Sequence, residues 1–63
     1  MKIRMLVNGH TAQQYEFEYG QKILAKQILE GNMVVDDETR QLAKIEGLKE
    51  TGSYTVYPKI AGG

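Results

Sequence analysis

The stretch KIRMLVNGHTAQQYEFEY, residues 2–19, decides the fold that this sequence predicts. Apolar and polar side chains alternate over residues 2–7 and again over residues 14–19, where aromatic side chains share one face and carboxylates the other. Between them lies Asn8-Gly9, a pair that tolerates the positive φ angles of a type I′ turn. The pattern predicts a β-hairpin over residues 2–19. The aromatic side chains expected to pack in the core, rather than to form a stacking platform for bases, are Tyr15, Phe17 and Tyr19.

A helix is predicted after the hairpin. Gly20 interrupts the strand alternation, and residues 21–30 (QKILAKQILE) adopt helical spacing. Gly31-Asn32 is expected to cap the C-terminal end, where a positive φ is common. The expected buried stripe consists of Leu24, Ala25, Ile28 and Leu29, with Ile23 off its edge. The residues expected to face away from the core are Lys22, Lys26, Gln27 and Glu30.

Residues 33–47 leave two alternatives open. Residues 33–35 form a short apolar run that could cover one end of the core, and Asp36-Asp37 could cap a second helix over residues 38–46. The same stretch also fits a turn followed by a strand over residues 41–45. We favour the strand, because a mixed sheet needs more than three strands to cover one helix well. Gly47 ends the element in either case.

The last predicted element is a strand over residues 53–57, SYTVY, which is rich in β-formers. Pro58 ends it, because proline cannot donate a hydrogen bond to a ladder. This strand would most simply insert beside the first one and parallel to it, a connection that the right-handed crossover rule permits. The order hairpin, helix, weak strand or helix, and strand therefore predicts an α+β domain with a β-grasp arrangement.

Length and composition exclude several classes of protein. The 63 residues suit one small domain, and the absence of cysteine excludes disulfides, thiolate metal sites and thiol catalysis. Eight basic residues balance eight acidic ones, whereas nucleic-acid binders usually carry a basic excess. No apolar run approaches the roughly 20 residues of a membrane span, and no signal peptide is recognisable. We expect a cytoplasmic protein with no nucleic-acid or membrane partner.

The functional signal lies in the final residues, Gly62-Gly63. Glycines add nothing to a fold there, and a frayed end or a tag remnant would explain them equally simply. The functional explanation is access, because residues without side chains can thread a narrow channel. The carboxylate of Gly63 could then reach the α-phosphate of ATP in another enzyme. Adenylation would convert it into an acyl group open to a sulfur or amine nucleophile.

With a final strand, Pro58 and then residues 60–63 (Ile-Ala-Gly-Gly), the chain resembles the ubiquitin-like β-grasp proteins. It is most similar to the sulfur carriers of thiamine and molybdopterin biosynthesis. Residues 6–9 (Leu-Val-Asn-Gly) resemble the first hairpin turn of the thiamine-type carriers, whereas residues 32–50 show no clear equivalent of the family's central strands. The resemblance implies a β-grasp domain over residues 1–60, with one helix on a mixed sheet, and a flexible tail over residues 61–63.

The resemblance further implies a carrier and not an enzyme. A ubiquitin-activating-type enzyme would adenylate Gly63 with ATP and Mg, sulfur transfer would make a thiocarboxylate, and a synthase would accept the sulfur for a cofactor, a tRNA base or a metabolite. The chain itself would bind no cofactor and no metal. The residues implied in partner binding are Lys59, Ile60 and Ala61 beside the tail, and an outward apolar patch of Leu6, Leu42 and Val56 on the sheet.

Two other functions stay open. The same tail would serve a ubiquitin-like modifier joined to lysines, and the glycines would be incidental in a small binding or assembly module. An enzyme is the weakest alternative, because no catalytic constellation is present. The candidate groups all have simpler explanations: His10 as a polar turn residue, Glu16 and Glu18 as outward strand residues, Asp36-Asp37-Glu38 as a solvated turn or helix start, and Ser53 as a strand residue.

Overall fold

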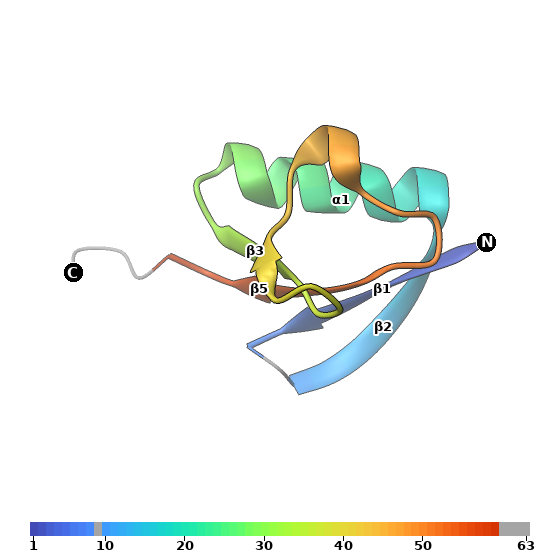
Figure 1. Cartoon of the computed structure of the whole chain (residues 1–63), viewed down its shortest axis with the longest axis horizontal. Helices are drawn as coiled ribbons and strands as arrows, with labels where there is room; N and C mark the ends of the chain where they lie inside the picture. Colours follow the sequence, from blue (N-terminus) through green and yellow to red (C-terminus); the bar gives the residue numbers. More distant parts are fainter. Residues whose placement is uncertain (9, 60–63) are drawn as a thin grey trace.

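The computed structural model describes residues 1–8 and 10–59, without the side chains of residues 10 and 11. One helix packs across one face of a mixed five-stranded sheet (Figure 1). The strands are β1 (Lys2–Val7), β2 (His10–Glu16), β3 (Met33–Asp36), β4 (Gln41–Leu42) and β5 (Ser53–Tyr57). The helix is α1 (Phe17–Leu29), and a short 3-10 turn, η1 (Ile45–Gly47), lies beside it.

The last strand occupies the centre of the sheet, whose order is β2-β1-β5-β3-β4. It runs parallel to β1, with Leu6 opposite Thr55, and antiparallel to β3, with Val34 opposite Val56. The prediction that the final strand inserts beside the first and parallel to it is therefore confirmed. The arrangement of one helix on this mixed sheet is consistent with a β-grasp-like fold.

The two N-terminal strands pair antiparallel, with Lys2 opposite Glu16 and Val7 opposite His10. The register shifts between Met5 and Val7. Asn8 has the positive φ of 55° that the turn prediction requires of it. Gly9, the second residue of the predicted turn, lies outside the described residues.

The predicted strand over residues 14–19 is wrong beyond Glu16, where the chain passes directly into α1. Gly20 is a buried residue inside the helix and not a breaker. A side chain there would begin 2.0 Å from Cγ2 of Ile3, so glycine allows α1 to approach β1 closely. Phe17 packs partly against the core from its place in the helix, whereas Tyr19 lies exposed on the helix, contrary to expectation.

The rest of α1 follows most of the predicted stripe. Leu24 is fully buried and Ile28 packs against the core, but Leu29, expected in the core, is 78% exposed. The predicted cap is confirmed, because Gly31 adopts a φ of 89° and donates to the carbonyl of Ile28 at 3.0 Å.

The central segment differs from both alternatives. The run at residues 33–35 belongs to β3, a full strand of the sheet whose Val34 is buried beside Val56. Residues 32–50, where the sequence showed no clear equivalent of central strands, therefore contribute both β3 and β4. The favoured strand over residues 41–45 exists only as Gln41–Leu42, and the alternative helix over residues 38–46 is replaced by a turn, β4 and η1.

The core lies between α1 and the inner face of the sheet. Full burial of a large apolar side chain contributes roughly 1.5–3 kcal/mol each, which a domain this small needs from nearly every core position. The buried core residues are Ile3, Leu24, Val34, Leu48, Tyr54 and Val56.

No helix among residues 1–8 and 10–59 is long and apolar enough to cross a membrane.

Candidate functional site

The face of the sheet that points away from α1 carries a row of side chains across four strands. Leu6 lies opposite Thr55, Thr55 opposite Val35, and Val35 opposite Leu42. Their sequence neighbours Val34 and Val56 point into the core, so alternation places this row on the opposite face. The next pair, Met33 and Tyr57, lies on the same outer face for the same reason.

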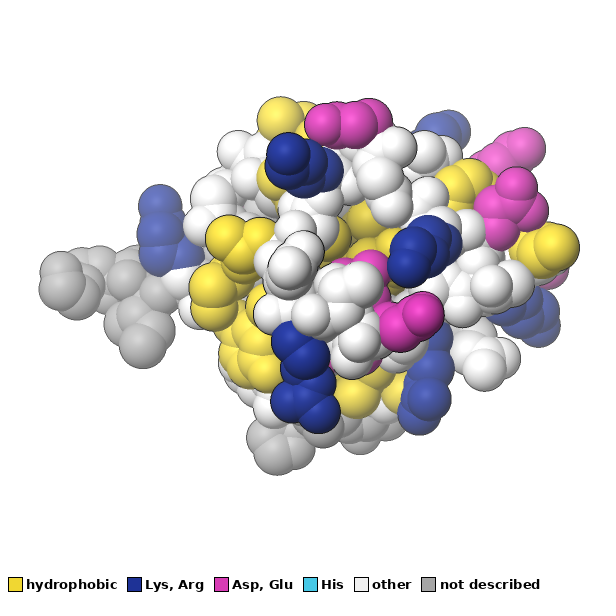
Figure 2. All heavy atoms as spheres, in the orientation of Figure 1, with side chains coloured by type: hydrophobic (Ala, Val, Ile, Leu, Met, Phe, Trp, Pro, Cys, Tyr) yellow, Lys and Arg dark blue, Asp and Glu magenta, His cyan; other side chains and the backbone are white. Residues whose placement is uncertain are grey.

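This outer face holds most of the exposed apolar strand side chains. Leu42 is 65%, Met33 48% and Tyr57 41% exposed, while Leu6 and Val35 are half-buried. Figure 2 shows hydrophobic side chains gathered at the end of the domain where β5 leaves the sheet, with Lys and Arg side chains around them. We call the set Leu6, Met33, Val35, Leu42 and Tyr57 the outer apolar surface.

One residue predicted for this surface is misplaced. Val56 was expected on the outward face with Leu6 and Leu42, but it is only 2% exposed and belongs to the core. The reason is the register of the parallel pair, which sets Val56 opposite Val7 and gives Leu6 the neighbour Thr55. Tyr57 and Val35 take the outward positions instead, and simple alternation within residues 53–57 contains the signal that would have found Tyr57.

A polar clasp covers the middle of the outer face. The buried hydroxyl of Thr55 donates to Oδ1 of Asp37 at 2.6 Å, and the hydroxyl of Ser53 donates to Oδ2 at 2.8 Å. Oδ1 of Asp36 accepts the backbone N–H of Glu38 at 2.9 Å. Of the two explanations offered for Asp36-Asp37-Glu38, the structure supports a turn, which is bound to β5, and not the start of a helix.

The chain leaves the sheet at Tyr57, and Pro58 and Lys59 are exposed beyond it. The backbone N–H of Lys59 donates to Oδ1 of Asn32 at 2.9 Å. The sequence analysis placed Asn32 in the helix cap, but this bond to Lys59 was not predicted, because it depends on where β5 ends in space. The remaining predicted site residues, Ile60, Ala61, Gly62 and Gly63, lie outside the described residues, and their roles stay predictions.

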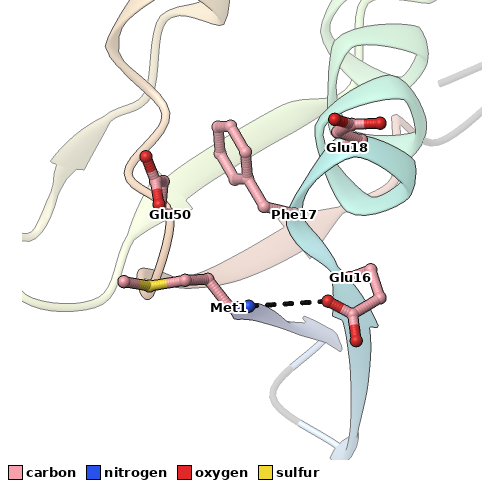
Figure 3. Close-up of a pocket in the computed structure, with 5 residues that line it drawn as sticks. All are labelled: Met1, Glu16, Phe17, Glu18 and Glu50. Atoms are coloured by element: carbon pink, nitrogen blue, oxygen red, sulfur yellow. Dashed lines mark ion pairs between the residues drawn. The ribbon is translucent and has the colours of Figure 1, made fainter.

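An acidic hollow of about 460 Å³ lies at the opposite end of the domain, lined by Met1, Glu16, Phe17, Glu18 and Glu50 (Figure 3). The N-terminal amine lies 3.5 Å from Oε2 of Glu16. Glu16 and Glu18 do not share a strand face as predicted, because Glu18 lies in the first turn of α1, where a carboxylate complements the helix dipole. In Figure 3 the Phe17 ring lies between the Glu18 and Glu50 side chains.

Other candidate groups contribute no reactive arrangement in the part of the chain that the structure describes. Ser53 is a strand residue, as predicted, and its hydroxyl is bonded to Asp37. His10 begins β2, and its side chain lies outside the described residues. Within the described ranges, no three His, Asp or Glu side chains come together in a way that could hold a metal ion.

Comparison with family models, curated proteins and solved structures finds no match to this chain.

Proposed function

We propose that the chain is a ubiquitin-like sulfur carrier. In this proposal the carboxylate of Gly63 attacks the α-phosphate of Mg-bound ATP in an activating enzyme, forming an acyl-adenylate and releasing pyrophosphate. Hydrosulfide then attacks the acyl carbon, the new C–S bond replaces the C–O bond to AMP, AMP leaves, and the thioacid loses its proton. The resulting thiocarboxylate is the sulfur donor for a synthase that builds a cofactor, a thiolated tRNA base or another metabolite.

The observation that carries the proposal is the path of β5. This strand lies in the centre of the sheet, between β1 and β3, so its end is held from both sides. It leaves the sheet at Tyr57, itself part of the outer apolar surface, and Pro58 and Lys59 follow in exposed positions. An enzyme that binds the outer apolar surface would therefore hold the domain beside the point from which residues 60–63 depart.

The outer apolar surface suits a protein partner better than a small substrate. Its members lie across four neighbouring strands as a face, whereas the acidic hollow described above lies at the other end of the sheet. Exposed apolar side chains grouped on a small domain are typical of protein–protein contact. We propose that Leu6 and Leu42 within this surface, together with Lys59, Ile60 and Ala61, contact the activating enzyme.

Intact-mass measurement tests the proposal. The protein is isolated from its own host and then incubated with each adenylating enzyme of that host, Mg-ATP and sulfide. We expect a mass gain equal to the replacement of one oxygen by sulfur, and no gain in a variant that lacks Gly63. A lysine-linked adduct to another protein instead would identify a modifier. Unchanged mass with no ATP–pyrophosphate exchange against any of those enzymes would leave only the binding module.

A further inference from the structure

The junction between β5 and the tail contains an unusual continuation of strand pairing. The β3–β5 ladder ends with Met33 opposite Tyr57, and Pro58 has no N–H with which to extend it. The next donor along the chain is the N–H of Lys59, and its acceptor is the side-chain oxygen of Asn32 at 2.9 Å. The Asn32 amide thus takes the place of a backbone carbonyl and continues the pairing past the proline.

Asn32 is itself held firmly by the last turns of α1. Its side-chain Nδ2 donates to Oε1 of Gln27 at 2.8 Å, and its backbone N–H donates to the carbonyl of Gln27 at 3.0 Å. The first bond orients the amide so that Oδ1 faces Lys59. Asn32 is also half-buried, which restricts its rotamers further. The acceptor of the Lys59 N–H is therefore fixed to the helix and not to a loop.

The Lys59 side chain adds a second contact to the same end of the helix. Its Nζ lies 3.5 Å from the point where a side chain at Gly31 would begin. Gly31 follows Glu30, the C-terminal cap of α1, and the terminal carbonyls of this helix carry partial negative charge. An ammonium group is favoured at that place. Backbone and side chain of Lys59 thus both face the C-terminal end of α1.

We propose that Asn32 is a positioning residue for the reacting tail, an inference that rests on the proposed carrier function. The Asn32 clasp, defined as Gln27, Asn32 and Lys59, fixes the start of the tail against α1. Four residues beyond Lys59 can reach at most about 14 Å, against about 21 Å for the six residues beyond a released Tyr57. The clasp therefore shortens the distance from the folded domain that the Gly63 carboxylate can reach.

Three variants separate positioning from folding. Asn32→Ala removes the acceptor, and Asn32→Asp keeps an acceptor for the Lys59 N–H. Glu30→Ala is the matched control, because Glu30 is an exposed neighbour whose side chain makes no hydrogen bond or ion pair with the residues that the structure describes. The first measurement is hydrogen exchange of the Lys59 amide by NMR in the free protein. We expect protection in the wild type, Glu30→Ala and Asn32→Asp, and its loss in Asn32→Ala while the amides of β5 stay protected.

The second measurement is ATP–pyrophosphate exchange with the host adenylating enzyme that accepts the wild-type chain. Releasing the clasp adds an ordering cost on binding, so we expect Asn32→Ala to raise KM about 3- to 10-fold with kcat nearly unchanged. Asn32→Asp should restore most of the wild-type KM, and Glu30→Ala should leave it unchanged. A purely structural role would not produce this division between KM and kcat.

The outcomes distinguish the two proposals. If the Lys59 amide of the wild type is unprotected from hydrogen exchange, the Asn32 clasp does not form and the positioning proposal is wrong, independently of the result with the enzyme. An unchanged KM in Asn32→Ala overturns positioning while leaving the carrier function in place. If no adenylating enzyme accepts the wild type, the carrier function fails and the positioning role fails with it, although the exchange data still show whether the clasp forms.

Discussion

The two faces of one sheet differ in what their apolar residues gain from folding. On the inner face, Val34, Tyr54 and Val56 are buried against α1, and the fold accounts for them fully. On the outer face, Tyr57 of the same strand β5 is 41% exposed, and Leu42 of β4 is 65% exposed. The inner residues therefore stabilise the domain, whereas the outer apolar surface contributes less to stability and is the surface for which we propose a partner.

The largest expected effect is on the inner side. Leu24→Ala removes a fully buried side chain and should lower the free energy of unfolding by about 2–5 kcal/mol. A domain of this length holds only about 3–9 kcal/mol in total, at roughly 0.05–0.15 kcal/mol per residue. Urea denaturation followed by circular dichroism should therefore show a much lower transition midpoint than that of the wild type. A loss below about 1 kcal/mol would contradict the assignment of Leu24 to the core.

A smaller loss is expected where α1 meets β1. Gly20→Ala places a methyl group 2.0 Å from Cγ2 of Ile3, and overpacking of this kind costs about 1–3 kcal/mol. The loss should appear in urea denaturation although alanine favours helix more than glycine does. Lys22→Ala, on the exposed side of the same helix, is the control and should change stability by less than about 0.5 kcal/mol. Stabilisation by Gly20→Ala would show that the helix does not approach Ile3 this closely.

The polar clasp of Asp37 with Ser53 and Thr55 should contribute less to the free energy of unfolding than the core does, and more than the exposed apolar side chains around it. Asp37→Ala leaves the buried Thr55 hydroxyl without its acceptor and should cost about 1–3 kcal/mol in urea denaturation. In the background Thr55→Val, the same Asp37→Ala change should cost clearly less, because one of its two hydroxyl partners is already absent. Strictly additive losses would show that the two side chains do not interact.

The smallest effect on stability is expected from substituting two exposed leucines, one on the sheet and one on the helix. Leu42→Ser lies on the outer apolar surface and Leu29→Ser on the helix, and each should change the free energy of unfolding by less than about 0.5 kcal/mol. Only Leu42→Ser should weaken adenylation, with kcat/KM in pyrophosphate exchange falling by about tenfold, as for a central contact residue. Equal activity of the two variants would remove the outer apolar surface from the proposed interface.

Much of the architecture follows from local patterns in the sequence. The alternation in residues 2–7 and 53–57 placed the two strands that pair in parallel, and the positive φ at Gly31 was expected from its place after the helix. The boundary at Glu16 could not be predicted, because residues 15–19 satisfy a strand period while Gly20 meets its partner Ile3 only in the folded chain. Tertiary contact, and not local preference, sets that boundary.

The candidate site was less predictable than the fold. Leu6 and Leu42 lie on the outer face as expected, but Val56 does not, although alternation within residues 53–57 already separates it from Tyr57. β3 has only four residues, too short a run to show a clear period. Asn32 was expected only as part of the helix cap, and its bond to Lys59, 27 residues further along the chain, is visible only in the structure.

The parallel pairing of β1 with β5 has a mechanical consequence. Because the two strands point the same way, Met1 and Lys59 lie at opposite ends of the domain (Figure 1). A pull on the tail against the N-terminal end would slide β5 along β1, loading the evenly spaced bonds of the ladder together in shear instead of unzipping them one at a time. The domain would stay folded under traction while its C-terminal segment is drawn into another protein.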